Sequence, residues 1–385
     1  MKMMKPPSRK GRPARAGAEA PMDRAQFVEL IRELSSIAGP AGREEPVART
    51  FAAHLKDLAR EAYLDPQGNA VIKIAGRQAK AAFMLCAHTD EVGLIVRSIT
   101  PDGLIYFDLN GGIDPRTLLA TQVEINTAEG RVPGVVVSPS AHLSRPEERA
   151  KALAVHELWI QVGASSEAEA RALGIRIGDP ITFRSNFQEL AGGYLAGKGL
   201  DDRVGLAVVI AAVRRAARRD RDYDLYVAAP VQEEIGARGA GVVARALRPA
   251  AALIVDVVSA MEPGMPLSRV AVACEKGPVI RVWDFVRPDL MGTCYDRRMV
   301  DRLVRVAETN GILHQLDASH TWTDGAVVAR EGIPTGGIFI PRRGSHSPCE
   351  VMSLMDAEAA TDLLAAFLEG LTGADLVALA ASRPL

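Results

Sequence analysis

The chain is poor in cysteine, and the few cysteines that it has are scattered. Cys86, Cys274, Cys294 and Cys349 lie far apart and form no CxxC pair. This spacing indicates neither a zinc knuckle nor a disulfide framework. We therefore expect the reducing cytoplasm as its compartment.

Long apolar runs and net charge are lacking as well. The longest uncharged apolar stretch, from Val204 to Val213, is about half of what a bilayer span requires. The 46 basic residues nearly cancel the 47 acidic ones and leave a formal charge of −1. No overall field draws such a chain to nucleic acid or to anionic lipid, so we expect neither as a partner and look for function in local sites.

One end of the chain departs from this balance. The first 18 residues carry six basic side chains and no acidic one, without the apolar segment of a secretory signal. We predict that residues 1–22 form a disordered basic tail, because blocks of like charge are usually solvated. Binding of nucleic acid or a surface by this tail is the less favoured alternative.

The chain does have the length to bury a large core. Its 385 residues suggest two domains, or one large domain that carries an insertion. Apolar runs of strand length alternate with helical segments, which is typical of an α/β fold with a mostly parallel central sheet flanked by helices. The expected strands cover residues 81–87, 224–229, 251–257 and 335–340, and the expected helices cover about 202–219, 238–247, 296–310 and 356–369.

Residues 92–188 have a different pattern. Short β-rich pieces are separated there by Gly, Pro, Asp and Asn, with little sign of alternating helices. This pattern predicts a small β domain inserted into the α/β domain, which then covers residues 23–91 and 189–385.

His88 and Asp90 come directly after the first of the buried strands. Alternate side chains of an extended chain share a face, so Asp90 can hold the imidazole of His88 as a metal ligand. By itself the motif is more often a simple hydrogen-bonded histidine at a strand end.

Asp201 and Asp202 stand in a glycine-rich turn that leads into an apolar helix. The segment from Gly192 to Lys198 imitates the start of a phosphate-binding loop, but Gly199 stands where that motif needs Ser or Thr. No strongly apolar strand leads directly into the turn, so nucleotide binding is discounted. The plain interpretation of the two acids is a helix N-cap and a dipole-complementing carboxylate, a role that we expect for at least one of them.

Three further signals lie on the other strands. Glu233 and Glu234 follow the second strand, where open α/β sheets place their ligands, although a solvated acidic loop has the same appearance. Asp256 lies inside an otherwise apolar strand, and a buried acid there needs a partner or a metal. His346 follows the last strand, and Asp324 is interpreted as a helix cap in preference to a residue that supports the site.

These signals share one edge of the predicted sheet and together supply two histidines and several carboxylates. Imidazole and carboxylate suit Zn²⁺, Co²⁺ or Mn²⁺. Two metals that share a bridging carboxylate activate water for amide hydrolysis. The other hydrolase routes lack support, since there is no GxSxG elbow and no cysteine in a nucleophile motif.

The motifs occur in the order found in one family. The chain resembles the tetrahedral aminopeptidase (glutamyl aminopeptidase) family of dinuclear metallopeptidases over nearly everything after residue 22. The segments that carry the resemblance are His88-Thr89-Asp90-Glu91-Val92-Gly93, Gly197-Lys198-Gly199-Leu200-Asp201-Asp202-Arg203, Gln232-Glu233-Glu234-Ile235-Gly236, Val255-Asp256 and His346-Ser347-Pro348.

The resemblance implies a ligand set for two divalent ions, with zinc favoured over cobalt or manganese. In this set Asp201 bridges the ions, Glu234 and His346 complete one site, and His88 and Asp256 complete the other. The family often has an aromatic and then an aliphatic residue between its Arg and the His-Ser-Pro triplet, whereas this chain has Gly and Ser.

The resemblance also implies the other roles. Glu233 is expected to act as the general base and Asp90 to orient His88. The fold implied is an α/β catalytic domain of the phosphorylase/hydrolase type, interrupted by a β-rich oligomerisation domain. We therefore expect a cytoplasmic aminopeptidase that trims short peptides within a homo-oligomer, with a dodecamer favoured. The alternatives are a metal-dependent deacylase or amidase and a catalytically silent assembly subunit.

Overall fold

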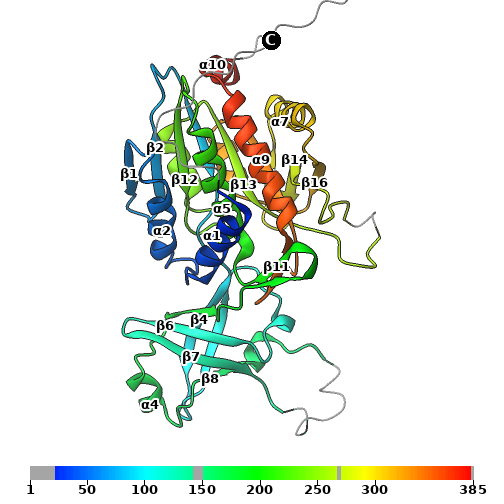
Figure 1. The fold of residues 1–385 in the computed structure, drawn as a ribbon. Helices are drawn as coiled ribbons and strands as arrows, with labels where there is room; N and C mark the ends of the chain where they lie inside the picture. The colour runs from blue at the N-terminus through cyan, green and yellow to red at the C-terminus, as the bar shows by residue number, and fades with distance from the viewer. Residues whose placement is uncertain (1–21, 141, 143–150, 267–269, 383–385) are drawn as a thin grey trace, which may run out of the picture.

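The computed structural model describes residues 22–140, 142, 151–266 and 270–382. The prediction of a basic tail over 1–22 therefore falls, apart from Met22, outside the described residues. Two parts are visible in Figure 1, an α/β part above and a small β barrel below. Both parts agree with the fold class that the sequence predicts.

The α/β part is built on a mixed sheet of twelve strands. Four central strands, in the order β12 (Asp224–Ala229), β3 (Ala82–Cys86), β13 (Ala251–Ser259) and β17 (Thr335–Arg343), run parallel. These are the four strands expected from the apolar runs. The flanking strands are mainly antiparallel, namely β1 (Glu61–Leu64), β2 (Ala70–Ile74), β10 (Gln188–Leu190), β11 (Tyr194–Gly197), β14 (Val279–Val286), β15 (Met291–Cys294), β16 (Gln315–Ser319) and β18 (Glu350–Ser353).

Helices cover both faces of this sheet, as the alternation on β3 illustrates. Phe83 and Leu85 pack with one hydrophobic cluster, and Met84 and Cys86 pack with another on the opposite face. The first face carries α1 (Arg24–Ser36), α2 (Glu45–Leu55), α5 (Leu200–Ala216), α7 (Arg297–Asn310), α9 (Leu354–Gly370) and α10 (Gly373–Ala380), and the second carries α6 (Ala240–Leu247) and α8 (Gly325–Arg330).

The helix ends follow ordinary capping chemistry. Asp23 and Gln26 form a capping box at the start of α1, and Asp296 accepts a hydrogen bond from the backbone of Arg298 at the start of α7. Gly311 caps the carboxyl end of α7 with a φ of 67°, a left-handed conformation that glycine adopts without strain. No single helix in the described part of the chain is long and apolar enough to cross a membrane, whereas α9 and α10 together have the length and composition but meet at a 90° bend.

The lower part is a closed barrel of six strands in the order β4-β5-β8-β7-β6-β9. Every short β piece expected between residues 92 and 188 forms one of its strands. The strands are β4 (Gly93–Ile99), β5 (Ile105–Asn110), β6 (Gln122–Thr127), β7 (Gly130–Val137), β8 (Trp159–Gln161) and β9 (Pro180–Phe183), with the short helices η1 (Pro115–Thr117), η2 (Val155–Glu157) and α4 (Glu167–Ala172). Its own apolar core, which includes Leu94, Phe107 and Ile181, fills the interior.

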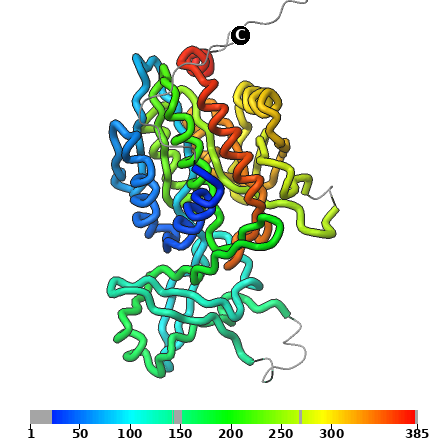
Figure 2. The backbone as a smooth tube through the Cα atoms, viewed as in Figure 1, coloured from blue at the N-terminus to red at the C-terminus, as the bar shows by residue number. Residues whose placement is uncertain are grey.

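The barrel is attached at the carboxyl edge of the parallel strands. The chain leaves β3 at Cys86 and enters β4 at Gly93, so only six residues separate the sheet from the barrel. Figure 2 shows the barrel as a separate unit below the edge of the sheet. Since open α/β sheets bind ligands at this edge, the barrel lies beside the expected site.

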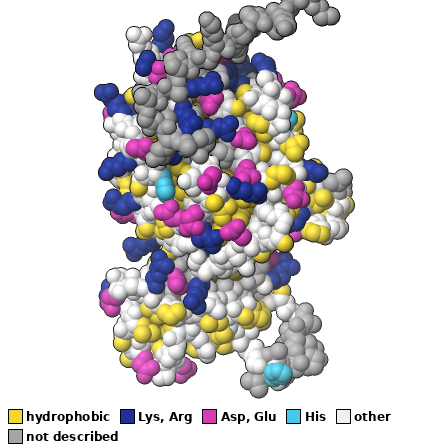
Figure 3. All heavy atoms as spheres, in the orientation of Figure 1, with side chains coloured by type: hydrophobic (Ala, Val, Ile, Leu, Met, Phe, Trp, Pro, Cys, Tyr) yellow, Lys and Arg dark blue, Asp and Glu magenta, His cyan; other side chains and the backbone are white. Residues whose placement is uncertain are grey.

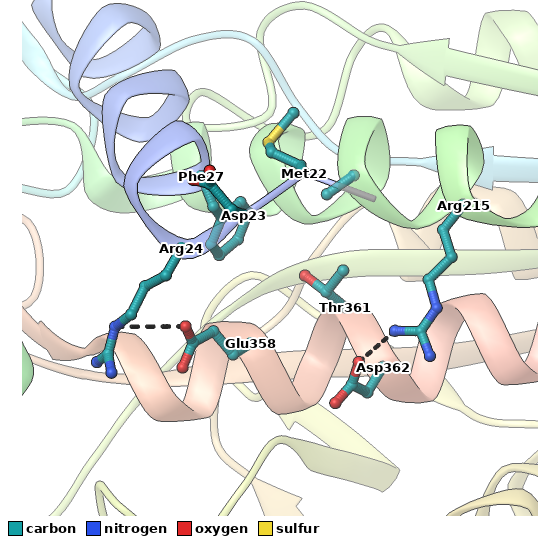
Figure 4. A pocket seen from close by; sticks show the side chains of 9 residues that line it. Met22, Asp23, Arg24, Phe27, Arg215, Glu358, Thr361 and Asp362 are labelled. Carbon is teal, nitrogen blue, oxygen red and sulfur yellow. Dashed lines mark hydrogen bonds and ion pairs between the residues drawn. The ribbon is translucent and has the colours of Figure 1, made fainter. Parts of the chain in front are cut away.

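A small surface cavity of about 120 Å³ lies elsewhere, among α1, α5 and α9 (Figure 4). Arg24 of α1 pairs with Glu358 of α9 at 3.4 Å, and Arg215 of α5 pairs with Asp362 of α9. These ion pairs join the helices on the outside of the core. None of the predicted site residues lines this cavity.

Candidate active site and metal centre

The structure brings all seven predicted site residues together at the carboxyl edge of the parallel strands. They come from segments far apart in the sequence, because the ends of neighbouring parallel strands meet at one edge. Six are buried and the His346 side chain is 32% exposed. The seven are His88, Asp90, Asp201, Glu233, Glu234, Asp256 and His346.

Asp201 lies between the two histidines. Its Oδ1 is 3.1 Å from Nε2 of His88, and its Oδ2 is 3.3 Å from Nε2 of His346. Each imidazole thus meets a different oxygen of one buried carboxylate. This placement between two imidazole nitrogens is compatible with the bridging role that the family resemblance implies for Asp201.

Two groups of ligand atoms are close enough to surround an ion. One atom each from His88, Asp201 and Glu234 lie within 4.8 Å of one another, and so do one atom each from His88, Asp202 and Asp256. Oδ1 of Asp256 is 3.9 Å from Nε2 of His88. Asp202 was expected only as a capping acid, and the structure brings it to the second group as well.

Asp202 also performs the expected capping. The peptide between Asp201 and Asp202 is cis, and regular helical backbone of α5 begins after them. Oδ1 of Asp202 accepts a hydrogen bond from the backbone N–H of Gly205 at 3.1 Å. A Cβ on Gly205 would lie 2.2 Å from this carboxylate, so a side chain at this position would displace Asp202.

The donor set fits divalent ions. Oε1 of Glu234 and Oδ2 of Asp202 are buried and have no hydrogen-bond partner. A buried carboxylate oxygen without a partner is costly, and coordination by a cation removes that cost. Two imidazoles among carboxylates are the chemistry preferred by zinc, cobalt and manganese.

The pKa values of the cluster also fit a site for divalent ions. Burial raises the pKa of Glu234 to about 8 and that of Asp256 to about 6. The charge of Glu234 raises the pKa of His346 to about 10. Burial opposes the charge on His88, but the carboxylates of Asp201 and Asp90 outweigh it and raise its pKa. Without a cation the cluster therefore retains protons, and metal binding would release them.

Asp90 contacts the loop of Glu233 and Glu234 as well as His88. Its Oδ1 lies 3.3 Å from Nδ1 of His88, which is an ion-pair distance, although this nitrogen makes no hydrogen bond of regular geometry. The same side chain accepts hydrogen bonds from the backbone N–H groups of Glu233, at 2.9 Å, and Glu234, at 3.0 Å. One buried acid thus ties the His88 segment to the loop that carries both glutamates.

The barrel contributes to the orientation of His346. Nδ1 of His346 is 2.9 Å from the carbonyl oxygen of Gly112, in the loop after β5. A carbonyl can only accept a hydrogen bond, so Nδ1 carries a proton in this contact, and Nε2 is the nitrogen that is left to bind a metal once its own proton is released. A Cβ on Gly112 would lie 3.2 Å from this Nδ1.

Arg342 and Glu350, which the sequence interpretation missed, contact and support Asp201. Arg342 forms a buried ion pair with Asp201. Glu350 accepts hydrogen bonds from the backbone N–H groups of Asp201, at 2.9 Å, and His346, at 3.1 Å, and pairs with Arg342 at 3.3 Å. The sequence signal that could have identified them is a charged residue at a strand end, namely Arg342 near the end of β17 and Glu350 at the start of β18.

A second buried charge cluster joins the two motifs on either side of the site. Glu91 lies 2.8 Å from Nζ of Lys198 and 3.5 Å from Arg203, and all three side chains are almost fully buried. The guanidinium of Arg203 also donates to the carbonyl oxygens of Leu34 and Ile37. The acid and the two bases therefore hold the His88 and Asp201 segments at a fixed separation.

The cap interpretation of Asp324 was wrong. Asp324 precedes α8, but its side chain makes no capping hydrogen bond. Oγ1 of Thr323 accepts the N–H of Gly325 instead. The buried carboxylate of Asp324 faces Sγ of Cys86 at 3.7 Å, and burial raises its pKa to about 7.

Buried imidazoles and carboxylates at the carboxyl edge of four parallel strands are typical of a metal-dependent hydrolase. The model of the M42 glutamyl aminopeptidase family matches residues 68–363, and the chain belongs to this family. It is a metal-dependent aminopeptidase, a hydrolase that acts on peptide bonds. The family resemblance noted in the sequence is confirmed.

Relatives match over almost the whole chain. A lysyl aminopeptidase of Pyrococcus furiosus is 33% identical over 90% of this chain and 98% of its own length. The structure of an aminopeptidase from the archaeon Desulfurococcus kamchatkensis is 35% identical, with a TM-score of 0.88 over 93% of this chain and 99% of that one. The TET1 peptidase of Pyrococcus horikoshii, which can assemble into a tetrahedron or a large octahedral shell, is 29% identical, with a TM-score of 0.80 over 90% of this chain and 100% of its own.

Proposed function

We propose that the chain removes N-terminal residues from short peptides with two divalent ions per subunit. The position of Asp201 between His88 and His346 is the observation that carries this proposal. The proposed ligands are His88, Asp201, Glu234, Asp256 and His346. Zinc is the proposed ion, with cobalt or manganese as alternatives.

Glu233 is the proposed general base. It is buried and lines the cavity beside the ligand cluster, and burial raises its pKa well above the ordinary value. A carboxylate of raised basicity can take a proton from the attacking water and deliver it to the departing amine nitrogen. Bound divalent ions would supply polarisation of the scissile carbonyl and acidify the water. Asp90 is the proposed positioning residue, since it holds both His88 and the backbone of Glu233.

Removal of metal should abolish the activity. Treatment with a chelator is expected to reduce cleavage of short free-amine peptides to background, and zinc, cobalt or manganese should restore it, because no other electrophile is assigned to the scissile carbonyl. Elemental analysis of the reconstituted protein should give about two ions per chain. The matched control is the same set of peptides with an acetylated N-terminus, which an aminopeptidase leaves intact.

Each alternative predicts a different result in this assay. Metal-dependent cleavage of the acylated substrates alone would favour a deacylase or amidase. No turnover with any metal would favour a catalytically silent subunit. A content that never exceeds one ion per chain would contradict the dinuclear centre while leaving an aminopeptidase possible.

Residues 92–188 are the proposed oligomerisation domain, and residues 23–91 and 189–385 are the proposed catalytic domain. All five proposed ligands lie outside the barrel, so its outer surface is available for association. Hydrophobic side chains are visible across this surface in Figure 3. Large apolar residues exposed on the barrel are Leu119, Val135, Leu173 and Ile177. The solved structure of a 29% identical relative, PhTET1-12s, is a dodecamer and supports a dodecamer for this chain. The four free cysteines support the cytoplasm as the proposed compartment.

Light scattering of the full-length protein tests the assembly. We expect a particle of about twelve 41.1 kDa subunits, since soluble homo-oligomers favour closed symmetry. The pair of changes Val135→Glu and Ile177→Glu should lower the mass, because it would bury charges in the interface. Val377→Glu, at an exposed apolar position on α10, is the matched control. A monomeric wild-type mass at micromolar concentration would contradict the proposal and leave the metal chemistry unaffected.

A further inference from the structure

A cavity of about 380 Å³ opens beside the candidate metal centre. Its lining includes Asp201 and Glu233 and continues over the end of β13 and the turn between β14 and β15 to the loop after β16. Val257, Val286 and Trp322 provide apolar surface in this outer part. A substrate residue that is held at the metal centre can extend its side chain over this apolar surface.

One carboxylate of the lining stands outside the proposed catalytic set. Asp289, in the turn between β14 and β15, lines the cavity and is exposed. Its Oδ2 accepts a hydrogen bond from Nε1 of Trp322 at 3.0 Å. Asp289 forms no ion pair with any residue in the described part of the chain. A neutral indole donor therefore fixes the carboxylate without cancelling its charge.

The cavity offers no comparable cation to an acidic side chain. Among the described residues that line it, Arg342 is the one lysine or arginine, and it is paired with Asp201 and Glu350. His320 packs its ring edge-to-face against Trp283 at 6.2 Å. Apart from the proposed catalytic set, the histidines and the paired Arg342, Asp289 is the one charged side chain of the described lining, and its charge is negative.

We infer that this cavity selects peptides whose N-terminal residue is lysine or arginine, and that Asp289 is the specificity-determining residue. The inference rests on the proposed function, because it takes the cavity as the pocket for that N-terminal side chain. The valines and the indole face contact the aliphatic stem, and the carboxylate of Asp289 accepts hydrogen bonds from the cationic head. An acidic N-terminal residue is rejected by the same carboxylate.

Lysine and norleucine p-nitroanilides provide a sharp probe, since norleucine has the stem of lysine without the ammonium group. For the metal-loaded wild type we expect kcat/KM to favour lysine by about 10- to 100-fold. In Asp289→Asn this ratio should fall to near one, while the amide oxygen can still accept the hydrogen bond from Trp322. Asp301→Asn, at an exposed acid on α7 outside the cavity, should retain the wild-type ratio.

Binding provides a second readout that does not need turnover. Lysinamide and norleucinamide can be titrated into the metal-loaded Glu233→Gln protein with and without the Asp289→Asn change. A preference for lysinamide that disappears with Asp289→Asn supports the inference. A lysine-to-norleucine ratio near one in the wild type, or a ratio that Asp289→Asn leaves unchanged, overturns it. If no free-amine substrate is cleaved, the proposed function is overturned instead. The titration would still show whether the cavity prefers lysinamide to norleucinamide.

Discussion

Asp201→Ala is expected to lower kcat/KM by about 1,000-fold or more and to remove both ions together. The reason is geometric: the Asp201 carboxylate contacts Nε2 of His88 with one oxygen and Nε2 of His346 with the other. Loss of a residue that belongs to only one site should do less. His346→Ala is therefore expected to retain about one ion and a larger share of the activity.

Metal content after dialysis and steady-state kinetics measure this difference. Asp201→Ala also removes one of the two carboxylates that pair with the buried Arg342, which is expected to lower the stability of the fold. Asp201→Asn is the matched variant, because it retains the shape and one acceptor oxygen while removing the charge. Circular dichroism establishes that each variant is folded. A folded Asp201→Ala protein that keeps both ions, or that is no less active than His346→Ala, would show that Asp201 is not the bridge.

The parallel core of the fold was predictable because its strands are buried on both faces. In β3, Phe83 and Leu85 pack in one hydrophobic cluster, and Met84 and Cys86 pack in the other. Because both faces of the strand are buried, its sequence is a continuous apolar run. Such runs are visible in a single sequence. The same holds for α5, whose residues are buried almost throughout.

The flanking strands were not predictable in the same way. Strand β1 is exposed at Glu61, Ala62 and Tyr63, and the three residues of β10 are all exposed. Their conformation comes from antiparallel pairing with β2 and β11, and not from an apolar pattern of their own. Strand β11 leads directly into the glycine-rich turn before Asp201, where no strand was expected.

The site residues were likewise predictable only in part. Asp201, Glu234 and their neighbours stand in motifs at strand ends, so topology alone predicts that they meet. Glu350 acts on Asp201 across 149 positions of sequence, through a hydrogen bond that only the folded chain creates. The error at Asp324 has the same cause, because its position before a helix is local but its contact with Cys86 spans 238 positions.

Glu233→Gln is expected to lower kcat by roughly two to four orders of magnitude while both ions stay bound. The substitution keeps the shape of the side chain and removes its basicity. Glu233 lines the cavity but belongs to neither group of ligand atoms, whereas Glu234 belongs to one and lies 3.4 Å from Nε2 of His346. We therefore expect opposite effects at the two adjacent glutamates, with loss of turnover at Glu233 and loss of metal affinity at Glu234.

Glu234→Gln is the matched control, since it makes the same change one residue further along. Asp90 accepts the backbone N–H groups of both positions, so neither substitution alters the hydrogen bonds that hold the loop. For Glu234→Gln we expect a weaker metal affinity, with activity partly restored by excess metal ions, a restoration that Glu233→Gln should not show. Metal titration together with kcat at saturating metal separates the two effects. Metal loss in Glu233→Gln, with full metal retention and a low kcat in Glu234→Gln, would mean that the base and the ligand have exchanged places.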